Sequence, residues 1–233
     1  MNLPLERPTI EFELQVDDLR ACIASLSLAD LLEGVKSPGF PDRIGSYQYT
    51  HSGGLFFACD PRPEEVFIKD IAHGVASLHR FNGQTLKRMT VAEHLYIASF
   101  EGPQATALER LLHDASEAYI GDVIRPLKII PIFGDLYLKI EHGIEQAIAT
   151  RYSLQYPFPP DVKHADEVIA HVEVMRNIGS NAVNHLADQA LKASIERGEK
   201  NHIDLFLFAP PLAEEMFLDR FYELTRERGV EPH

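Results

Sequence analysis

Apolar residues recur at helical spacing over most of the chain, from about residue 66 to residue 228. Leu108, Leu111, Leu112 and Ala115, for instance, fall three and four residues apart, which places them on one face of an α-helix. The pattern predicts helices over residues 66–78, 105–120, 141–152, 162–184 and 211–228. A further helix is predicted to begin at Thr90-Val91-Ala92-Glu93, which has the form of a capping box. Such a sequence predicts a mainly all-α fold.

The first part of the chain has a different pattern. One helix is predicted over residues 16–33, ending near Gly34. Residues 47–57 alternate loosely in polarity around Ser52-Gly53-Gly54, which predicts a small β-hairpin. We therefore divide the chain into an N-terminal extension over residues 1–45, which carries the extra helix, and a main domain over residues 46–233.

Composition and charge limit the class of protein. The chain has 22 basic and 35 acidic residues and a net charge of −13, which disfavours nucleic acid because its binding depends on clustered Lys and Arg. The apolar runs are too short to span a bilayer, and the two cysteines suit neither a disulfide framework nor a zinc knuckle. We therefore expect a cytoplasmic protein that binds neither nucleic acid nor membranes. A small anionic substrate such as a nucleotide remains compatible with this charge.

The dipeptide His113-Asp114 is the strongest functional signal in the sequence. His94 lies before it in the sequence, and Asp166 lies after it at a greater distance along the chain. Together these residues offer two imidazoles and two carboxylates, which are mixed nitrogen and oxygen ligands for a divalent metal. The sequence does not choose among Mn, Co, Fe, Ni, Zn and Mg.

Two more carboxylates follow the dipeptide closely. In a regular helix His113 and Glu117 lie one turn apart on the same face, while Asp114 is rotated by about 100°. Asp122 comes just after Gly121, where the predicted helix stops. Both carboxylates are therefore expected near the metal, where they could act on a molecule that it binds. These groups are typical of a hydrolase.

Several stretches of the chain resemble the HD-domain metal-dependent phosphohydrolases. Within that superfamily the chain looks most like the bacterial and phage group related to 5′-deoxyribonucleotidases and phage deoxynucleoside triphosphohydrolases. The similar stretches are Asp60-Pro-Arg-Pro-Glu-Glu, Asp70-Ile-Ala-His, Arg80-Phe-Asn-Gly-Gln-Thr, His113-Asp-Ala-Ser-Glu-Ala-Tyr-Ile-Gly-Asp and Arg125-Pro-Leu-Lys. The resemblance covers roughly residues 45–225, and residues 110–128 are its most specific segment.

The resemblance implies an HD-domain helical bundle that forms a homo-oligomer. It implies that one divalent metal is bound by His94, His113, Asp114 and Asp166. Glu117 is then expected to transfer protons, Asp122 to contact the sugar or share the proton work, and Arg80 to bind phosphate. Lys128 is expected as a second cation for phosphate. The implied reaction is hydrolysis of the 5′-phosphate ester of a nucleotide by a metal-activated water, in a bacterial cell or a phage-infected host.

Three alternatives remain open at this point. Deoxynucleoside monophosphates are the expected substrates; the alternatives are a deoxynucleoside triphosphate triphosphohydrolase of the dATP type and a non-catalytic nucleotide-binding HD protein, against which the intact ligand set and Glu117 argue. Gln84 and Leu95 stand where the family often has His and Ser, which bears on substrate identity. Two-metal phosphodiesterases carry extra His ligands in the interval where His142 and His164 lie here.

Overall fold

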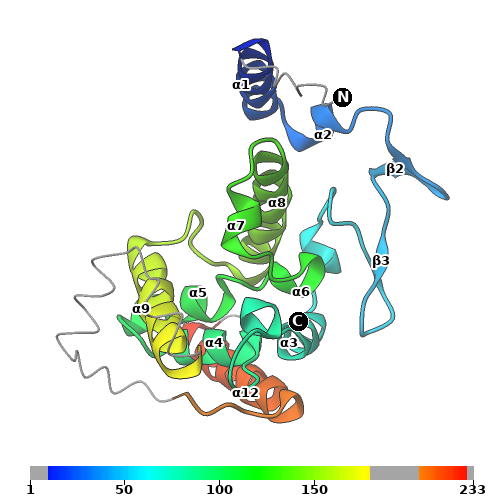
Figure 1. The fold of residues 1–233 in the computed structure, drawn as a ribbon. Helices are drawn as coiled ribbons and strands as arrows, with labels where there is room; N and C mark the ends of the chain where they lie inside the picture. Colours follow the sequence, from blue (N-terminus) through cyan, green and yellow to red (C-terminus); the bar gives the residue numbers. More distant parts are fainter. Residues whose placement is uncertain (1–9, 179–204, 230–233) are drawn as a thin grey trace.

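The computed structural model of the chain describes residues 10–178 and 205–229 (Figure 1). Its elements are α1 Ile10–Ser25, α2 Leu28–Leu31, β1 Lys36–Ser37, β2 Phe40–Ile44, β3 Gln48–Tyr49, β4 Leu55–Phe56, η1 Pro63–Glu65, α3 Ile68–Ser77, η2 Arg80–Gly83, α4 Val91–Ala98, η3 Gln104–Thr106, α5 Ala107–Leu112, α6 Glu117–Ile120, α7 Arg125–Lys128, α8 Phe133–Tyr152, α9 Pro160–Asn177 and α12 Pro210–Arg228. The described strands form two short antiparallel pairs, β1 with β2 and β3 with β4. The fold is mainly all-α, as predicted, and β3–β4 is the expected small hairpin.

The main apolar core gathers side chains from α3, α4, α5, α8 and α12. Phe217 and Phe221 of α12 are fully buried, and the ring of Tyr152 from α8 lies edge-on to Phe221 with the ring centroids 5.1 Å apart. Figure 1 shows α12, in orange and red, lying beneath α4, which it contacts. The helix α9 packs against α4 and α5. It therefore brings residues from late in the chain beside the segment that carries His113-Asp114.

The N-terminal segment folds differently from its prediction. In place of one helix over residues 16–33, α1 ends at Ser25 and the short helix α2 follows. The break lies at Ser27, whose side chain accepts a hydrogen bond from Asp30 N at 3.1 Å, while Ser27 N donates to Asp30 Oδ2 at 3.1 Å. This reciprocal capping box starts a new helix, because it satisfies backbone donors that a continuous helix would pair internally.

Ion pairs attach the N-terminal segment to the rest of the chain. Figure 1 places α1 beyond one end of α8, where Arg20 Nε lies 2.8 Å from Asp135 Oδ2. Arg43 of β2 is buried, and its guanidinium donates to Asp60 Oδ2 at 2.7 Å and to Glu65 Oε2 at 2.9 Å. Contacts of Arg43 therefore cross the predicted boundary between residues 45 and 46.

The segment predicted as one helix over residues 105–120 is two helices, α5 and α6, joined by a tight turn. Across the junction the backbone hydrogen bonds reach back three residues, from Ala115 N to Leu112 O and from Glu117 N to Asp114 O, both at 3.1 Å. Winding at three residues per turn aligns side chains three positions apart. Glu117 is therefore brought beside Asp114, and the expectation of a regular helix through this segment is wrong.

Two other helices have bounds that differ from the prediction. α8 begins at Phe133, well before residue 141, and α9 ends at Asn177 because Ile178 adopts an extended backbone conformation. Residues 179–184 of the predicted helix lie outside the described residues. The N-terminus of α4 is confirmed at Thr90, whose side chain accepts a hydrogen bond from Glu93 N at 3.1 Å.

The second half of the predicted capping box at α4 is not formed. Glu93 is fully buried and its carboxylate accepts hydrogen bonds from Leu207 N at 2.8 Å and from Phe208 N at 2.9 Å. Two backbone N–H groups of a distant segment thus replace the backbone N–H of Thr90, which a capping box would use as the donor. This exchange ties the segment before α12 to the helix that carries His94.

Arg110 of α5 is 1% exposed and holds several elements together. Its guanidinium donates to Ala98 O at 3.0 Å, to Pro103 O at 2.7 Å and to Asp161 Oδ2 at 2.8 Å. The Asp161 side chain is partly exposed, but removing the guanidinium also leaves the carbonyl oxygens of Ala98 and Pro103 without this donor, and each unsatisfied buried acceptor costs about 1–3 kcal/mol.

We therefore expect Arg110→Ala to lower the free energy of unfolding by about 2–5 kcal/mol in urea titrations. The exposed Arg226 of α12 provides the matched control, and Arg226→Ala should change it by less than about 0.5 kcal/mol. Equal losses in the two variants would contradict the assigned role of Arg110.

Candidate metal centre

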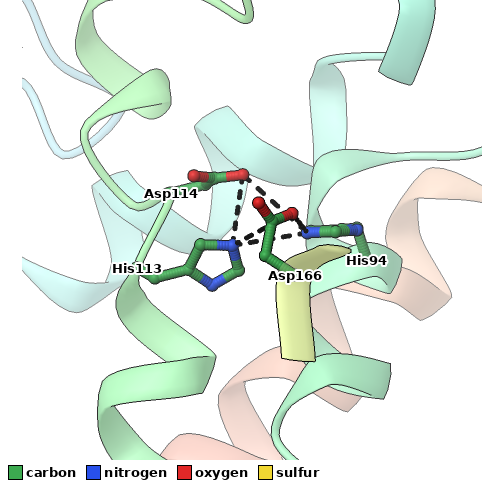
Figure 2. A group of neighbouring side chains, drawn as sticks. All are labelled: His94, His113, Asp114 and Asp166. Carbon is green, nitrogen blue, oxygen red and sulfur yellow. Dashed lines mark hydrogen bonds and ion pairs between the residues drawn. The ribbon is translucent and has the colours of Figure 1, made fainter. Parts of the chain in front are cut away.

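Four side chains from three parts of the chain converge on one point (Figure 2). His94 lies in α4, His113 and Asp114 lie at the junction between α5 and α6, and Asp166 lies in α9. Each offers one ligand atom, and these atoms all lie within 4.8 Å of one another. The two histidines are buried and the two aspartates are partly buried. The structure thus brings together all four residues predicted as metal ligands.

The distances within this group are those of atoms arranged around a common centre. His94 Nε2 lies 3.4 Å from His113 Nε2 and 3.2 Å from Asp166 Oδ1. His113 Nε2 lies 3.4 Å from Asp114 Oδ2 and 3.7 Å from Asp166 Oδ1. Figure 2 shows both imidazoles presenting this nitrogen toward the carboxylates.

The outer nitrogens of the two rings have partners that orient the inner ones. His94 Nδ1 lies 2.6 Å from Glu173 Oε1, and His113 Nδ1 lies 2.8 Å from Arg110 O. An oxygen acceptor behind each ring places the proton on Nδ1 and leaves the lone pair of Nε2 free, which is how metal-binding histidines are held. The donor set and its supporting bonds therefore fit a divalent metal ion.

Without a metal, the same group holds protons. Burial acts to lower the pKa of His113, but the charge of Asp114 and hydrogen bonds to Asp114 and Asp166 outweigh it and raise that pKa well above its ordinary value. Burial acts to raise the pKa of Asp114, but the charge of His113 keeps it below its usual range. A metal ion must therefore displace protons from this group when it binds.

Glu117 begins α6 and is 3% exposed. Burial, followed by the charges of Asp114 and Asp122, raises the pKa of Glu117 well above its ordinary value. Its Oε2 atom is buried and has no hydrogen-bond partner among the described residues. The structure therefore presents a buried carboxyl group with a raised pKa and one unpartnered oxygen beside the candidate metal ligands.

Arg80 of η2 reaches the same region from another part of the chain. Its guanidinium lies 3.2 Å from Glu173 Oε2 and 3.6 Å from Asp114 Oδ2. Burial disfavours the charge, but the surrounding carboxylates, Glu173 first, raise the pKa of Arg80, so that it stays charged. The predicted phosphate-binding arginine thus lies next to Asp114, a candidate metal ligand.

Asp122 and Lys128 are also brought to this region. Burial, together with the charge of Asp114, raises the pKa of Asp122, while Arg80 and, to a smaller extent, Lys128 act to lower it. Lys128 Nζ lies 2.8 Å from Glu141 Oε1 of α8, and its charge is felt by Glu117 as well. Lys128 is therefore no free surface cation, because a carboxylate of α8 already holds it.

Glu173 is the residue that sequence reasoning missed. It is fully buried in α9, and its two carboxylate oxygens contact His94 and Arg80. It follows Asp166 by seven residues, which is the spacing of two helical turns on one face. That spacing is the signal by which a sequence could point to it.

The residues of the two-metal alternative, His142 and His164, are both exposed and do not belong to the four-residue group.

None of the helices in the described ranges combines the length and the apolar character needed to cross a lipid bilayer. The fold and the site define a mainly helical protein with a buried group of two histidines and two aspartates that could hold a metal ion.

Comparison with known proteins places the chain among bacterial relatives. No protein-family model matches it. The uncharacterized protein YfdR of Escherichia coli K12 is 31% identical over 185 residues, which cover 78% of this chain and 98% of YfdR. An uncharacterized protein of Rhodobacter capsulatus is 33% identical over 147 residues, covering 58% of this chain and 74% of that protein. The chain therefore belongs to the same family as YfdR.

Proposed function

We propose that the protein is a metal-dependent phosphohydrolase that cleaves the 5′-phosphate ester of nucleotides, with deoxynucleoside monophosphates as its substrates. The observation that carries the proposal is the buried carboxyl of Glu117, with one unpartnered oxygen, beside the four candidate ligands. A site that only bound a metal or a nucleotide would not need such a group. Its pKa is raised by burial and by Asp114 and Asp122, so the carboxyl keeps its proton to a higher pH, as a proton donor must.

A divalent ion would be held by His94, His113, Asp114 and Asp166. When bound, it would supply a Lewis acid that makes a water acidic near neutral pH and offsets charge on a phosphoryl oxygen. Mixed imidazole and carboxylate donors suit Mn, Fe, Co, Ni and Zn better than Mg, which prefers oxygen ligands alone.

Residues of the chain itself bind the phosphate, donate the proton and contact the sugar. Arg80 presents several N–H donors, a geometry that matches phosphate oxygens and positions the phosphate. Glu117 donates a proton to the ester oxygen as the sugar departs, so that no alkoxide has to leave unprotonated. The charge of Asp122 raises the pKa of Glu117, so the two carboxyl groups share one region of the site. We propose that Asp122 contacts the sugar.

The charges around the site favour a monophosphate over a triphosphate. Among the described residues, Arg80 and Lys128 are the cations that lower the pKa of Glu117. Each already has a carboxylate partner, Glu173 for Arg80 and Glu141 for Lys128. A bound triphosphate carries more negative charge than a monophosphate and would need further cations to offset it. The described residues offer little positive charge for that purpose.

The experiment that tests the proposal is a substrate panel. Protein loaded with Mn²⁺, Co²⁺ or Zn²⁺ would be incubated with deoxynucleoside mono- and triphosphates, and released phosphate and triphosphate measured. We expect phosphate from monophosphates. Release of triphosphate would select the triphosphohydrolase instead, and absence of turnover with every metal and nucleotide would leave a nucleotide-binding protein as the better interpretation.

Two broader features belong to the same proposal. We expect the enzyme in the cytoplasm, where reducing conditions keep cysteines such as Cys22 and Cys59, both free in the structure, as thiols. We also expect a homo-oligomer. In support, Leu127, Ile129, Ile130 and Phe133 expose apolar side chains within one short stretch around the end of α7. Light scattering would measure the mass.

A further inference from the structure

Glu173 touches two parts of the proposed machinery at once. Its Oε1 atom lies 2.6 Å from His94 Nδ1, and its Oε2 atom lies 3.2 Å from both Nε and Nη2 of Arg80. Its side chain is completely buried, so water cannot replace either contact. One carboxylate therefore fixes the ring of a metal ligand and the guanidinium of the phosphate-binding arginine.

The same face of α9 also holds the loop that follows Arg80. Asp166, Glu173 and Asn177 are seven and four residues apart, which places them along one stripe of the helix. Asn177 is 2% exposed; its Oδ1 accepts from Lys87 N at 2.9 Å and its Nδ2 donates to Lys87 O at 2.8 Å. This single face thus carries the candidate metal ligand Asp166, the carboxylate that supports His94, and an anchor for the loop that follows Arg80.

The backbone around Arg80 depends on such anchoring. Phe81 and Asn82 both adopt positive φ angles, 55° and 52°, which are uncommon for residues other than glycine. Arg80 N donates to Met89 O at 3.0 Å, closing the base of the loop. Contacts from outside the loop must stabilise this conformation, and α9 provides them through Glu173 and Asn177.

We propose that Glu173 is a positioning residue that couples the metal site to Arg80, so that one buried carboxylate sets both metal affinity and phosphate affinity. Arg80's role in binding phosphate rests on the proposed function, whereas the effect on the metal does not. A carboxylate is required because both neighbours are donors: His94 Nδ1–H on one side and the guanidinium on the other. The amide of glutamine offers one acceptor and one donor, and can satisfy only one of them.

The test compares Glu173→Gln and Glu173→Ala with the control Glu167→Gln, an exposed position on the same helix. Mn²⁺ affinity would be measured by competition with a fluorescent chelator. We expect losses of about 10-fold for Glu173→Gln and about 100-fold for Glu173→Ala, the range found when the partner behind a ligating histidine is removed. The control should match the wild type. The isosteric Gln variant keeps the test valid if the Ala variant fails to fold.

Two further readouts separate positioning from general damage. The visible absorption spectrum of Co²⁺-loaded protein should change in Glu173→Gln and not in Glu167→Gln, because only the former alters the orientation of a ligand. Binding of inorganic phosphate to the Mn²⁺-saturated protein, measured by calorimetry, should also weaken in Glu173→Gln. Unchanged Mn²⁺ affinity or unchanged phosphate affinity in this variant would overturn the coupling, and so would an equal loss in the control.

The positioning role of Glu173 and the proposed function can be rejected independently of each other. If the wild type hydrolysed no nucleotide, the loss of Mn²⁺ affinity in Glu173→Gln would still support the role of Glu173 behind His94. If nucleotides were hydrolysed and both variants kept wild-type affinities, the positioning role would be overturned while the enzyme remained.

Discussion

Asp114→Asn is expected to lose stable metal binding while the chain stays folded. Asp114 Oδ2 is one of the four converging ligand atoms and lies 3.4 Å from His113 Nε2. An amide in its place is a poor ligand for a divalent metal and carries no charge. Loss of a direct ligand should exceed the 10- to 100-fold effect of altering its support, so we expect more than about a 100-fold fall in affinity.

Metal analysis after dialysis and thermal unfolding with and without Mn²⁺ measure this effect. A ligand at 100 times its dissociation constant stabilises the native state by about 2.7 kcal/mol, so the wild type should melt at a higher temperature when Mn²⁺ is added. Asp114→Asn should lose that shift. The control is Asp219→Asn, an exposed position on α12, which should keep it. Full metal content in Asp114→Asn would show that the four-residue group is not the metal site.

Helical periodicity was sufficient to predict the fold class and most of the elements. α3, α4 and α12 lie close to their predicted positions because an apolar stripe repeats along each of them. The junction between α5 and α6 was missed because every residue from Leu112 to Ile120 is compatible with a regular helix. The tighter winding there brings the buried carboxyl of Glu117 close enough to Asp114 for the charge of Asp114 to raise its pKa.

The candidate metal ligands were easier to predict from the sequence than the residue that orients one of them. His94, His113, Asp114 and Asp166 carry chemistry that a sequence pattern can suggest, and they do converge. Glu173 resembles any other helix carboxylate in the sequence, and its burial between two donors is visible only when α4, η2 and α9 are packed together.

Other interactions of this kind come from packing as well. The sequence offers Lys128 and Glu141 as separate charges, and α7 and α8 bring them to 2.8 Å. The same holds for Glu93, whose local capping role is replaced by contacts with the segment before α12. Long-range pairing of polar groups has no periodic signature, so it was the least predictable part of the site.

Glu117→Gln is expected to keep the metal and lower the turnover number by about 10²- to 10⁴-fold, the contribution of a positioned general acid. The amide fills the same volume but cannot give up a proton to the departing sugar oxygen. Metal content should be unchanged, because Glu117 is not one of the four converging ligands. The variant Glu167→Gln, on an exposed part of α9, serves as the control and should keep wild-type turnover.

The pH dependence gives the sharper test of this role. Burial, Asp114 and Asp122 raise the pKa of Glu117, so the carboxyl is protonated below that raised pKa and the acid is lost as pH increases through it. Wild-type kcat should therefore fall on the alkaline side, and this fall should be absent from the residual activity of Glu117→Gln.

Folded-state stability should change in the same direction, because ionising a buried carboxyl costs free energy and destabilises the wild type at high pH. Glu117→Gln, which has no charge to bury, should then be at least as stable as the wild type at alkaline pH. A variant that was slower, equally metal-loaded and no less stable would separate proton donation from structure, whereas full activity in Glu117→Gln would remove Glu117 from the mechanism.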